Sequence, residues 1–87
     1  MSQEFNEKLI KCLVETAIFL EFADESVVDP DSSIEMMEII SSELQGLNSR
    51  DIKYCSEQIG KIAASYSGAK KEFVMRLPSY LGITNES

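Results

Sequence analysis

Apolar residues recur every three or four positions through most of the chain, which is the spacing of one face of an α-helix. Nothing in the pattern is typical of a β-strand. From this spacing we predict four helices, over about residues 2–23, 30–45, 49–67 and 69–77. Pro78 is expected to interrupt the last helix, residues 78–82 to add one short helical turn, and residues 83–87 to fray.

The same spacing predicts which side of each helix is buried. The predicted buried positions are Phe5, Leu9, Cys12, Leu13, Thr16, Leu20 and Ala23 in the first helix, then Met37, Ile40, Leu44 and Leu47, then Ile52, Cys55, Ile59, Ile62 and Tyr66, and finally Phe73, Val74 and Leu77, with Tyr80 and Leu81 folded onto the core. Four such helices predict an all-α protein, a compact antiparallel bundle that forms one domain over residues 1–87.

Two helix starts carry clear local signals. Asp29 is a good N-cap residue and Pro30 suits the first helical position. Asn48 is predicted to cap the next helix, with Asp51 three residues further on, as in a capping box. Gly46 is a natural end for the helix between them.

The chain has 87 residues, two cysteines and no histidine. Cys12 and Cys55 are expected to be reduced core residues, with a disulfide between them as the alternative. The N-terminus is acidic, unlike that of a signal peptide, and no apolar stretch reaches the ~18 residues that a membrane span needs. We therefore expect a cytoplasmic protein without a membrane partner.

The net charge of −7 is concentrated in one segment. Residues 12–49 contain no lysine or arginine, and the rest of the chain has eight basic residues against six acids. The nine acids of this segment are Glu15, Glu21, Asp24, Glu25, Asp29, Asp31, Glu35, Glu38 and Glu43. Nucleic acid is excluded as a direct ligand by the lack of a cationic face, so a basic protein partner is favoured.

A helical wheel places Asp31, Glu35 and Glu38 on one narrow face, with Ile39 close to it. It also places Ile18 and Phe22 among polar positions, where apolar residues rimmed by carboxylates resemble a protein interface. The predicted partner-binding residues are Glu15, Ile18, Phe22, Asp24, Glu25, Asp29, Asp31, Glu35, Glu38 and Ile39. The alternatives are that the chain after Pro78 covers Ile18 and Phe22, and that the acids form only a solvated face.

Signals for catalysis are missing from the sequence. There is no histidine, no phosphate-binding glycine loop and no nucleophile motif, so we expect no enzyme activity and no cofactor. Residues 24–35 have the length of an EF-hand loop, but Asp29 occupies the position where that loop requires glycine. We therefore expect no metal site.

The stretch 33–40, Ser-Ile-Glu-Met-Met-Glu-Ile-Ile, looks like the start of the second helix of acyl carrier proteins. In that family a serine carries a phosphopantetheine arm, and here it would be Ser33. Two departures stand against this reading. Ser32 replaces the aspartate that precedes the family's serine, and the preceding loop is shorter than the family's.

A second resemblance covers residues 5–66. The stretch 19–31, Phe-Leu-Glu-Phe-Ala-Asp-Glu-Ser-Val-Val-Asp-Pro-Asp, followed by 37–45, Met-Glu-Ile-Ile-Ser-Ser-Glu-Leu-Gln, resembles small helical immunity proteins of bacterial contact-dependent growth inhibition and other polymorphic toxin systems. The resemblance implies binding and neutralisation of a cognate basic toxin domain, often a nuclease, in the cytosol. Another reading is an acidic adaptor or inhibitor of a basic nucleic-acid-binding protein. The oligomeric state is left open.

Overall fold

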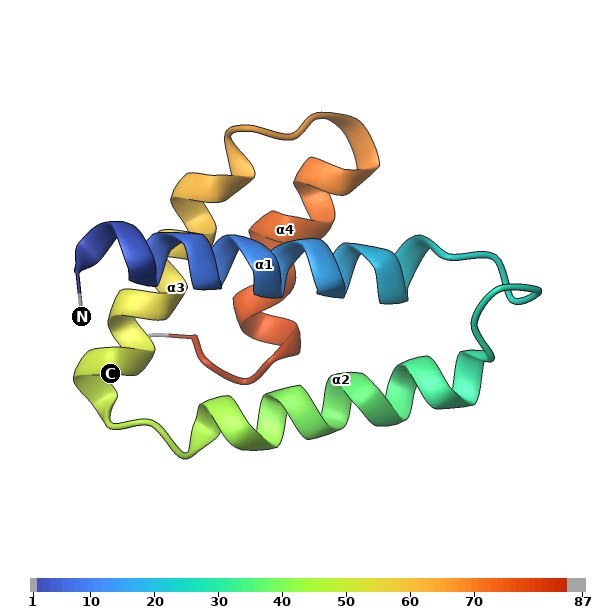
Figure 1. Ribbon diagram of the computed structural model, residues 1–87, viewed down its shortest axis with the longest axis horizontal. Helices are drawn as coiled ribbons and strands as arrows, with labels where there is room; N and C mark the ends of the chain where they lie inside the picture. The colour runs from blue at the N-terminus through green and yellow to red at the C-terminus, as the bar shows by residue number, and fades with distance from the viewer. Residues whose placement is uncertain (1, 85–87) are drawn as a thin grey trace.

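The computed structural model describes residues 2–84, which form four helices and no strand. They are α1 (Gln3–Phe22), α2 (Pro30–Gln45), α3 (Ser49–Ala63) and α4 (Gly68–Tyr80). The prediction of a small all-α bundle is confirmed. Figure 1 shows two pairs: α2 returns beneath α1, and α3 and α4 stand side by side behind α1, which crosses them steeply. None of these helices is long and apolar enough to cross a membrane.

The helix starts follow the local signals in the sequence. Asp29 Oδ2 accepts a hydrogen bond from the Ser32 backbone N–H at 3.1 Å, and Pro30 occupies the first turn of α2. Asn48 Oδ1 accepts one from the Asp51 N–H at 2.9 Å. Both predicted caps are confirmed, because each needs only residues within one turn of the helix start.

The core lies between α1, α3 and α4. Its buried residues are Val14, Ala17, Ile18, Cys55, Ile59, Ala63, Phe73, Val74, Leu77, Leu81 and Ile83. No residue of α2 is fully buried; Met37, Ile40 and Leu44 are half-buried against the core, as predicted, whereas Leu47 is exposed. This helix therefore covers one edge of a core that the other three helices build.

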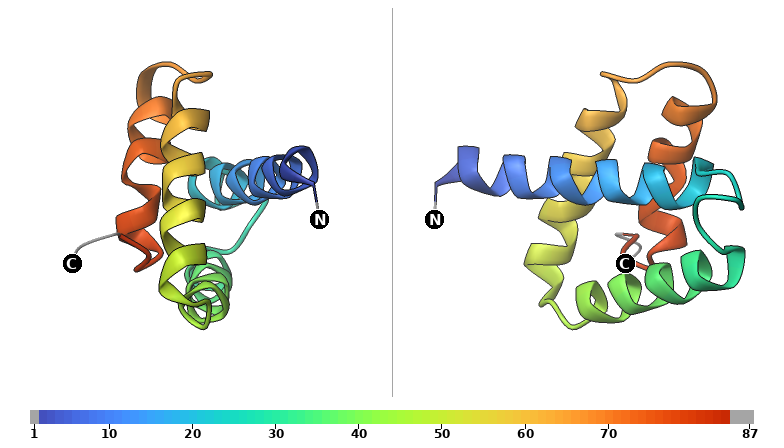
Figure 2. Two further views of the ribbon diagram at one scale, coloured as in Figure 1. Left: turned by 90° about the vertical axis from the view of Figure 1, so that its left-hand side faces the viewer. Right: turned by 45° about the vertical axis from the view of Figure 1, so that its right-hand side comes forward.

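The predicted buried stripe of α1 is wrong for most of its length. Phe5 and Leu9 are 46% and 50% exposed, and Cys12 and Thr16 are exposed as well. The side that packs on α3 and α4 holds Val14, Ala17 and Ile18. Because α1 crosses the other pair steeply, only a short central patch of the helix is covered (Figure 2).

The cysteines differ from each other in their surroundings. Both thiols are free, so the disulfide alternative is not formed. Cys55 is buried as predicted, and its burial raises the pKa of the thiol. Cys12 is exposed, because it lies on the side of α1 that faces away from the other helices, so its assignment to the core is wrong.

The C-terminal part of the chain is more ordered than the sequence suggested. α4 runs through Pro78 to Tyr80, because a proline in the last turn removes only one intrahelical hydrogen bond. Gly82 has φ +68° and ends the helix: its N–H donates to Ser79 O at 3.1 Å, and the Ile83 N–H donates to Pro78 O at 2.9 Å. This pair of bonds is a Schellman motif.

Ile83 is only 1% exposed, so the prediction that the chain frays from residue 83 is wrong at that residue. Residues 85–87 lie outside the described part of the chain. The helix predicted over 49–67 also ends earlier, at Ala63. From there to Tyr66 the chain forms tighter turns with i→i−3 hydrogen bonds. Leu81 is buried as expected, whereas Tyr80 is 55% exposed and turns to the surface.

Candidate partner-binding groove

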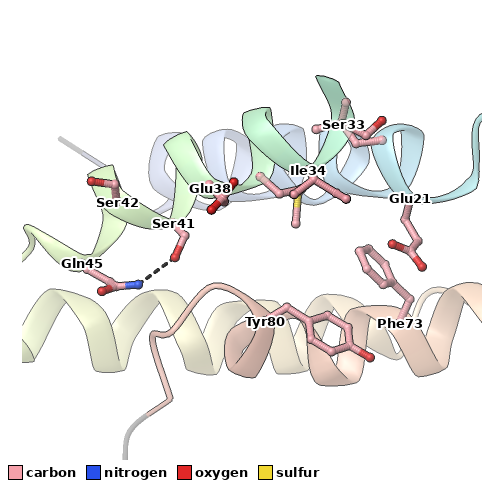
Figure 3. Close-up of a pocket in the computed structure, with 11 residues that line it drawn as sticks. Glu21, Ser33, Ile34, Glu38, Ser41, Ser42, Gln45, Phe73 and Tyr80 are labelled. Atoms are coloured by element: carbon pink, nitrogen blue, oxygen red, sulfur yellow. Dashed lines mark hydrogen bonds between the residues drawn. The ribbon is translucent and has the colours of Figure 1, made fainter. Parts of the chain in front are cut away.

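A groove of about 680 Å³ lies between α2 and α4. Figure 3 shows Ile34, Glu38 and Ser41 on the α2 side and Phe73 and Tyr80 on the α4 side. Its lining residues are Leu20, Glu21, Ser33, Ile34, Met37, Glu38, Ser41, Ser42, Gln45, Phe73 and Tyr80. The lining combines apolar and aromatic side chains with two carboxylates, which is the composition of a protein-binding groove.

Hydrogen bonds tie α2 to the turn after α4 beside the groove. Ser41 Oγ donates to the Leu81 carbonyl at 2.7 Å, and Gln45 Nε2 donates to Ser41 Oγ at 2.7 Å and to the same carbonyl at 3.2 Å. These bonds also satisfy a carbonyl at the end of α4 that has no partner within the helix. These bonds therefore fix the distance between the α2 wall and the α4 wall at one end of the groove.

The aromatic wall continues towards α1. The rings of Phe73 and Tyr80 lie 5.8 Å apart, and Phe22 meets Phe73 edge to face at 5.8 Å. Such pairs hold aromatic rings in defined orientations. Phe22 is 45% exposed, so this predicted anchor is accessible next to the groove, and residues 79–84 leave it uncovered to that extent.

The acids of α2 and its neighbours have no cation beside them within residues 2–84. Glu21 and Glu38 line the groove, and Asp31 and Glu35 are exposed on α2. The only ion pair in this part of the chain joins Lys11 and Glu15 at 3.9 Å. Glu21 and Glu38 therefore bring two carboxylates without an ion-pair partner in residues 2–84 to the groove.

The remaining predicted acids lie in the α1–α2 connection and are exposed. Asp24 Oδ1 accepts a hydrogen bond from the Ser26 N–H at 2.9 Å, and Asp29 caps α2. Glu25 is exposed in the same connection. Asp24 and Asp29 thus organise the local backbone while their charge remains on the surface.

Ile18 is the one predicted anchor that the structure excludes from the surface. It is 7% exposed and belongs to the core, because α1 turns this side towards α3 and α4. Ile39 is 47% exposed but does not line the groove. The sequence reading missed Ile34 as a groove residue and assigned Phe73 and Tyr80 to the core alone. The helical spacing of Ile34, Glu38 and Ser41 is a signal that could have indicated a second face of α2.

Glu15 lies in a separate cluster on α1. Its carboxylate accepts a hydrogen bond from the Tyr66 hydroxyl, and Lys11 Nζ lies 4.3 Å from the centre of the Tyr66 ring. Desolvation raises the pKa of the Tyr66 hydroxyl, and the hydrogen bond to Glu15 raises it further, while Lys11 acts in the opposite direction. This carboxylate is engaged within the protein and is not part of the groove.

We expect the Glu15→Gln substitution to lower the pKa of Tyr66 towards its ordinary value. The raised pKa means that the folded state favours the neutral phenol, so this contribution to stability is present below pH 10 and is lost as the pH rises through the pKa of the folded protein. Absorbance titration of phenolate formation measures the pKa of Tyr66, and the Tyr66→Phe variant identifies the part of the absorbance change that belongs to this residue. An unchanged Tyr66 titration in Glu15→Gln would contradict the contact.

The residues of this surface bear on two further kinds of chemistry, metal binding and modification of a serine. Within residues 2–84, no three His, Cys, Asp or Glu side chains gather closely enough to hold a metal ion. Ser33, the position that a phosphopantetheine arm would use, is half-buried and lines the groove. An intact mass measured on protein from its native cell tests that modification.

Comparison of the chain with protein-family models, with curated proteins and with solved structures gives no match. The chemistry of the groove therefore carries the functional argument.

Proposed function

We propose that this protein is an immunity protein that binds and neutralises a basic bacterial toxin domain. The observation that carries the proposal is the groove between α2 and α4, in which apolar walls and the unpaired carboxylates of Glu21 and Glu38 occur together. The sequence resemblance over residues 5–66 points to the same class of protein.

The chemistry of the groove fits a partner surface with apolar and basic side chains. Ile34, Phe73 and Tyr80 offer an apolar and aromatic wall for an anchor residue of the toxin. Carboxylates opposite lysine or arginine form charge-assisted hydrogen bonds, which are the strongest that side chains make. If the toxin is a nuclease, the acids occupy the cations that otherwise bind the phosphates of its substrate.

Acidic surfaces also act before contact is made. The uncompensated acids around the groove accelerate the encounter with a basic partner, and this acceleration declines as salt screens the charges. An inhibitor of another basic nucleic-acid-binding protein would use the same chemistry. Toxin neutralisation and inhibition of such a protein therefore differ in the partner that is bound and not in the surface that binds it.

A toxicity rescue assay tests the immunity function. Where the neighbouring gene encodes a large secreted protein, its C-terminal domain is expressed in a sensitive strain, with and without this protein. We expect growth only when the two are expressed together. Equal killing in both cultures would contradict the immunity function, whereas binding to a basic nucleic-acid-binding protein without rescue would favour the inhibitor reading.

We expect Glu38→Lys to weaken binding of that toxin domain about tenfold or more, mainly through slower association, because it places a cation in the groove. Glu43→Lys is the matched control: it makes the same change of charge at an exposed position of the same helix that does not line the groove. Stopped-flow association at several salt concentrations measures the effect. Equal losses in both variants would assign the effect to total charge and not to the groove.

A further inference from the structure

The outer side of α1 carries a regular apolar repeat that the fold leaves exposed at every position except half-buried Ala23. Its positions alternate by four and three residues, the heptad spacing of helices that pack side by side. They are Phe5, Leu9, Cys12, Thr16, Phe19 and Ala23, which we call the outer stripe. Phe5, Leu9 and Phe19 are 46%, 50% and 53% exposed, an unusual exposure for such large side chains.

The surroundings of the outer stripe leave room for another helix. Figure 1 shows α1 on the outside of the fold, with one side free along its length, and in Figure 2 its N-terminal half protrudes beyond α3. The stripe contains no charged residue. Its one hydroxyl, Thr16 Oγ1, already donates to the Cys12 carbonyl at 2.9 Å, so covering it would leave no donor without a partner.

We propose that two copies of this chain associate through an antiparallel pairing of their α1 helices along the outer stripe. Burial of the exposed aromatic and leucine side chains would drive the association. The groove between α2 and α4 stays available, and Leu20 and Phe22 border both surfaces.

The charges beside the stripe select a second copy and fix its direction. One flank holds Lys8, Glu15 and Phe22, and the other holds Asn6, Leu13 and Leu20. An antiparallel pair brings like flanks together, whereas a parallel pair brings opposite flanks together. Only the antiparallel arrangement therefore places Lys8 near Glu15 of the other copy. Tyr66 and Lys11 both approach Oε2 of Glu15, whose side chain is 56% exposed, so the second carboxylate oxygen is left for Lys8.

The register follows from the same charges. When Cys12 of each copy lies at the twofold axis, Lys8 of one copy lies level with Thr16 of the other and one residue, about 1.5 Å along the helix, from Glu15; the pair occurs twice. Lys8 is exposed and has no ion pair within residues 2–84. Antiparallel helices also oppose their dipoles favourably. A basic toxin domain has no comparable fit, since the stripe itself carries no acid.

Sedimentation velocity of the full chain over a dilution series tests the association. We expect a wild-type dimer, and a dissociation constant raised about 100-fold or more in Leu9→Lys, which puts a charge in the stripe. Ile39→Lys, on exposed apolar surface of α2, should leave it unchanged. Circular dichroism verifies that both variants retain their helices. Lys8→Glu should weaken the dimer, because it places a carboxylate near Glu15 of the other copy.

Cross-linking tests the direction. With diamide as oxidant, Cys12 is expected to link the two copies, and Cys12→Ser to abolish the link while buried Cys55 remains. In the Cys12→Ser background, a mixture of Phe5→Cys and Phe19→Cys proteins should form the mixed cross-link, and Phe5→Cys alone should form none. A Phe5→Cys self cross-link would overturn the antiparallel arrangement.

Two results would overturn the association itself. One is a wild-type protein that stays monomeric at every concentration. The other is a wild-type protein that is monomeric together with a Leu9→Lys variant that no longer binds the toxin domain. This result would show that the outer stripe binds the toxin domain and not a second copy. The first result needs no toxin domain, so the dimer and the immunity function can fail separately.

Discussion

Replacing Ile18 by alanine is expected to lower the free energy of unfolding by about 3 kcal/mol, because the removed atoms leave a cavity in a packed core. Ile18 is 7% exposed and lies in the cluster that α1, α3 and α4 form. The matched variant is Ile39→Ala, an isoleucine that is 47% exposed on α2. It should change the free energy of unfolding by less than about 1 kcal/mol.

Urea denaturation followed by far-ultraviolet circular dichroism measures both variants. The comparison distinguishes a core residue from a surface anchor at position 18. Truncating a core residue lowers the free energy of unfolding, whereas truncating a surface anchor mainly weakens partner binding. Similar small losses in Ile18→Ala and Ile39→Ala would contradict the arrangement of α1 described above.

The second large effect is expected at Gly82, where the Gly82→Ala substitution should destabilise the protein by about 2 kcal/mol. The backbone has φ +68° at this residue, a conformation that a Cβ atom disfavours. The added Cβ would also collide with the Gln45 side-chain amide, which donates to the Leu81 carbonyl. Both effects act on the turn that holds Leu81 and Ile83 in the core.

Gly60→Ala is the control for Gly82→Ala. Gly60 lies inside α3, and a Cβ there meets no atom within 4 Å. This variant should gain about 0.5–1 kcal/mol, because alanine loses less backbone freedom than glycine on forming a helix. Thermal unfolding of both proteins measures the difference. A Gly82→Ala protein as stable as the wild type would contradict the left-handed turn.

The combination of Gly82→Ala with Gln45→Ala separates the two causes. Removing the Gln45 amide relieves the collision but leaves the backbone strain at residue 82. We expect the Gly82→Ala substitution to cost less in the Gln45→Ala background than in the wild type, without disappearing. An equal cost in both backgrounds would assign the whole effect to the backbone.

The candidate site was predicted in part. The acidic character of α2 and of the connection before it could be read directly, because a stretch without cations is visible in one dimension. Phe73 and Tyr80 were not recognised as groove residues, since the groove forms only when α4 lies opposite α2. Glu15 was assigned to the partner surface, although Tyr66, distant in sequence, engages its carboxylate.

The sequence by itself determined the four helices, their capped starts at Asp29 and Asn48, and the segment of excess negative charge. These features depend on contacts within one or two turns or on composition. Only the tertiary structure decided which side of α1 is buried, because this helix has two apolar sides and either could have packed. The steep crossing with α3 and α4 selected the side of Val14, Ala17 and Ile18, and left the regular stripe from Phe5 to Phe19 on the surface.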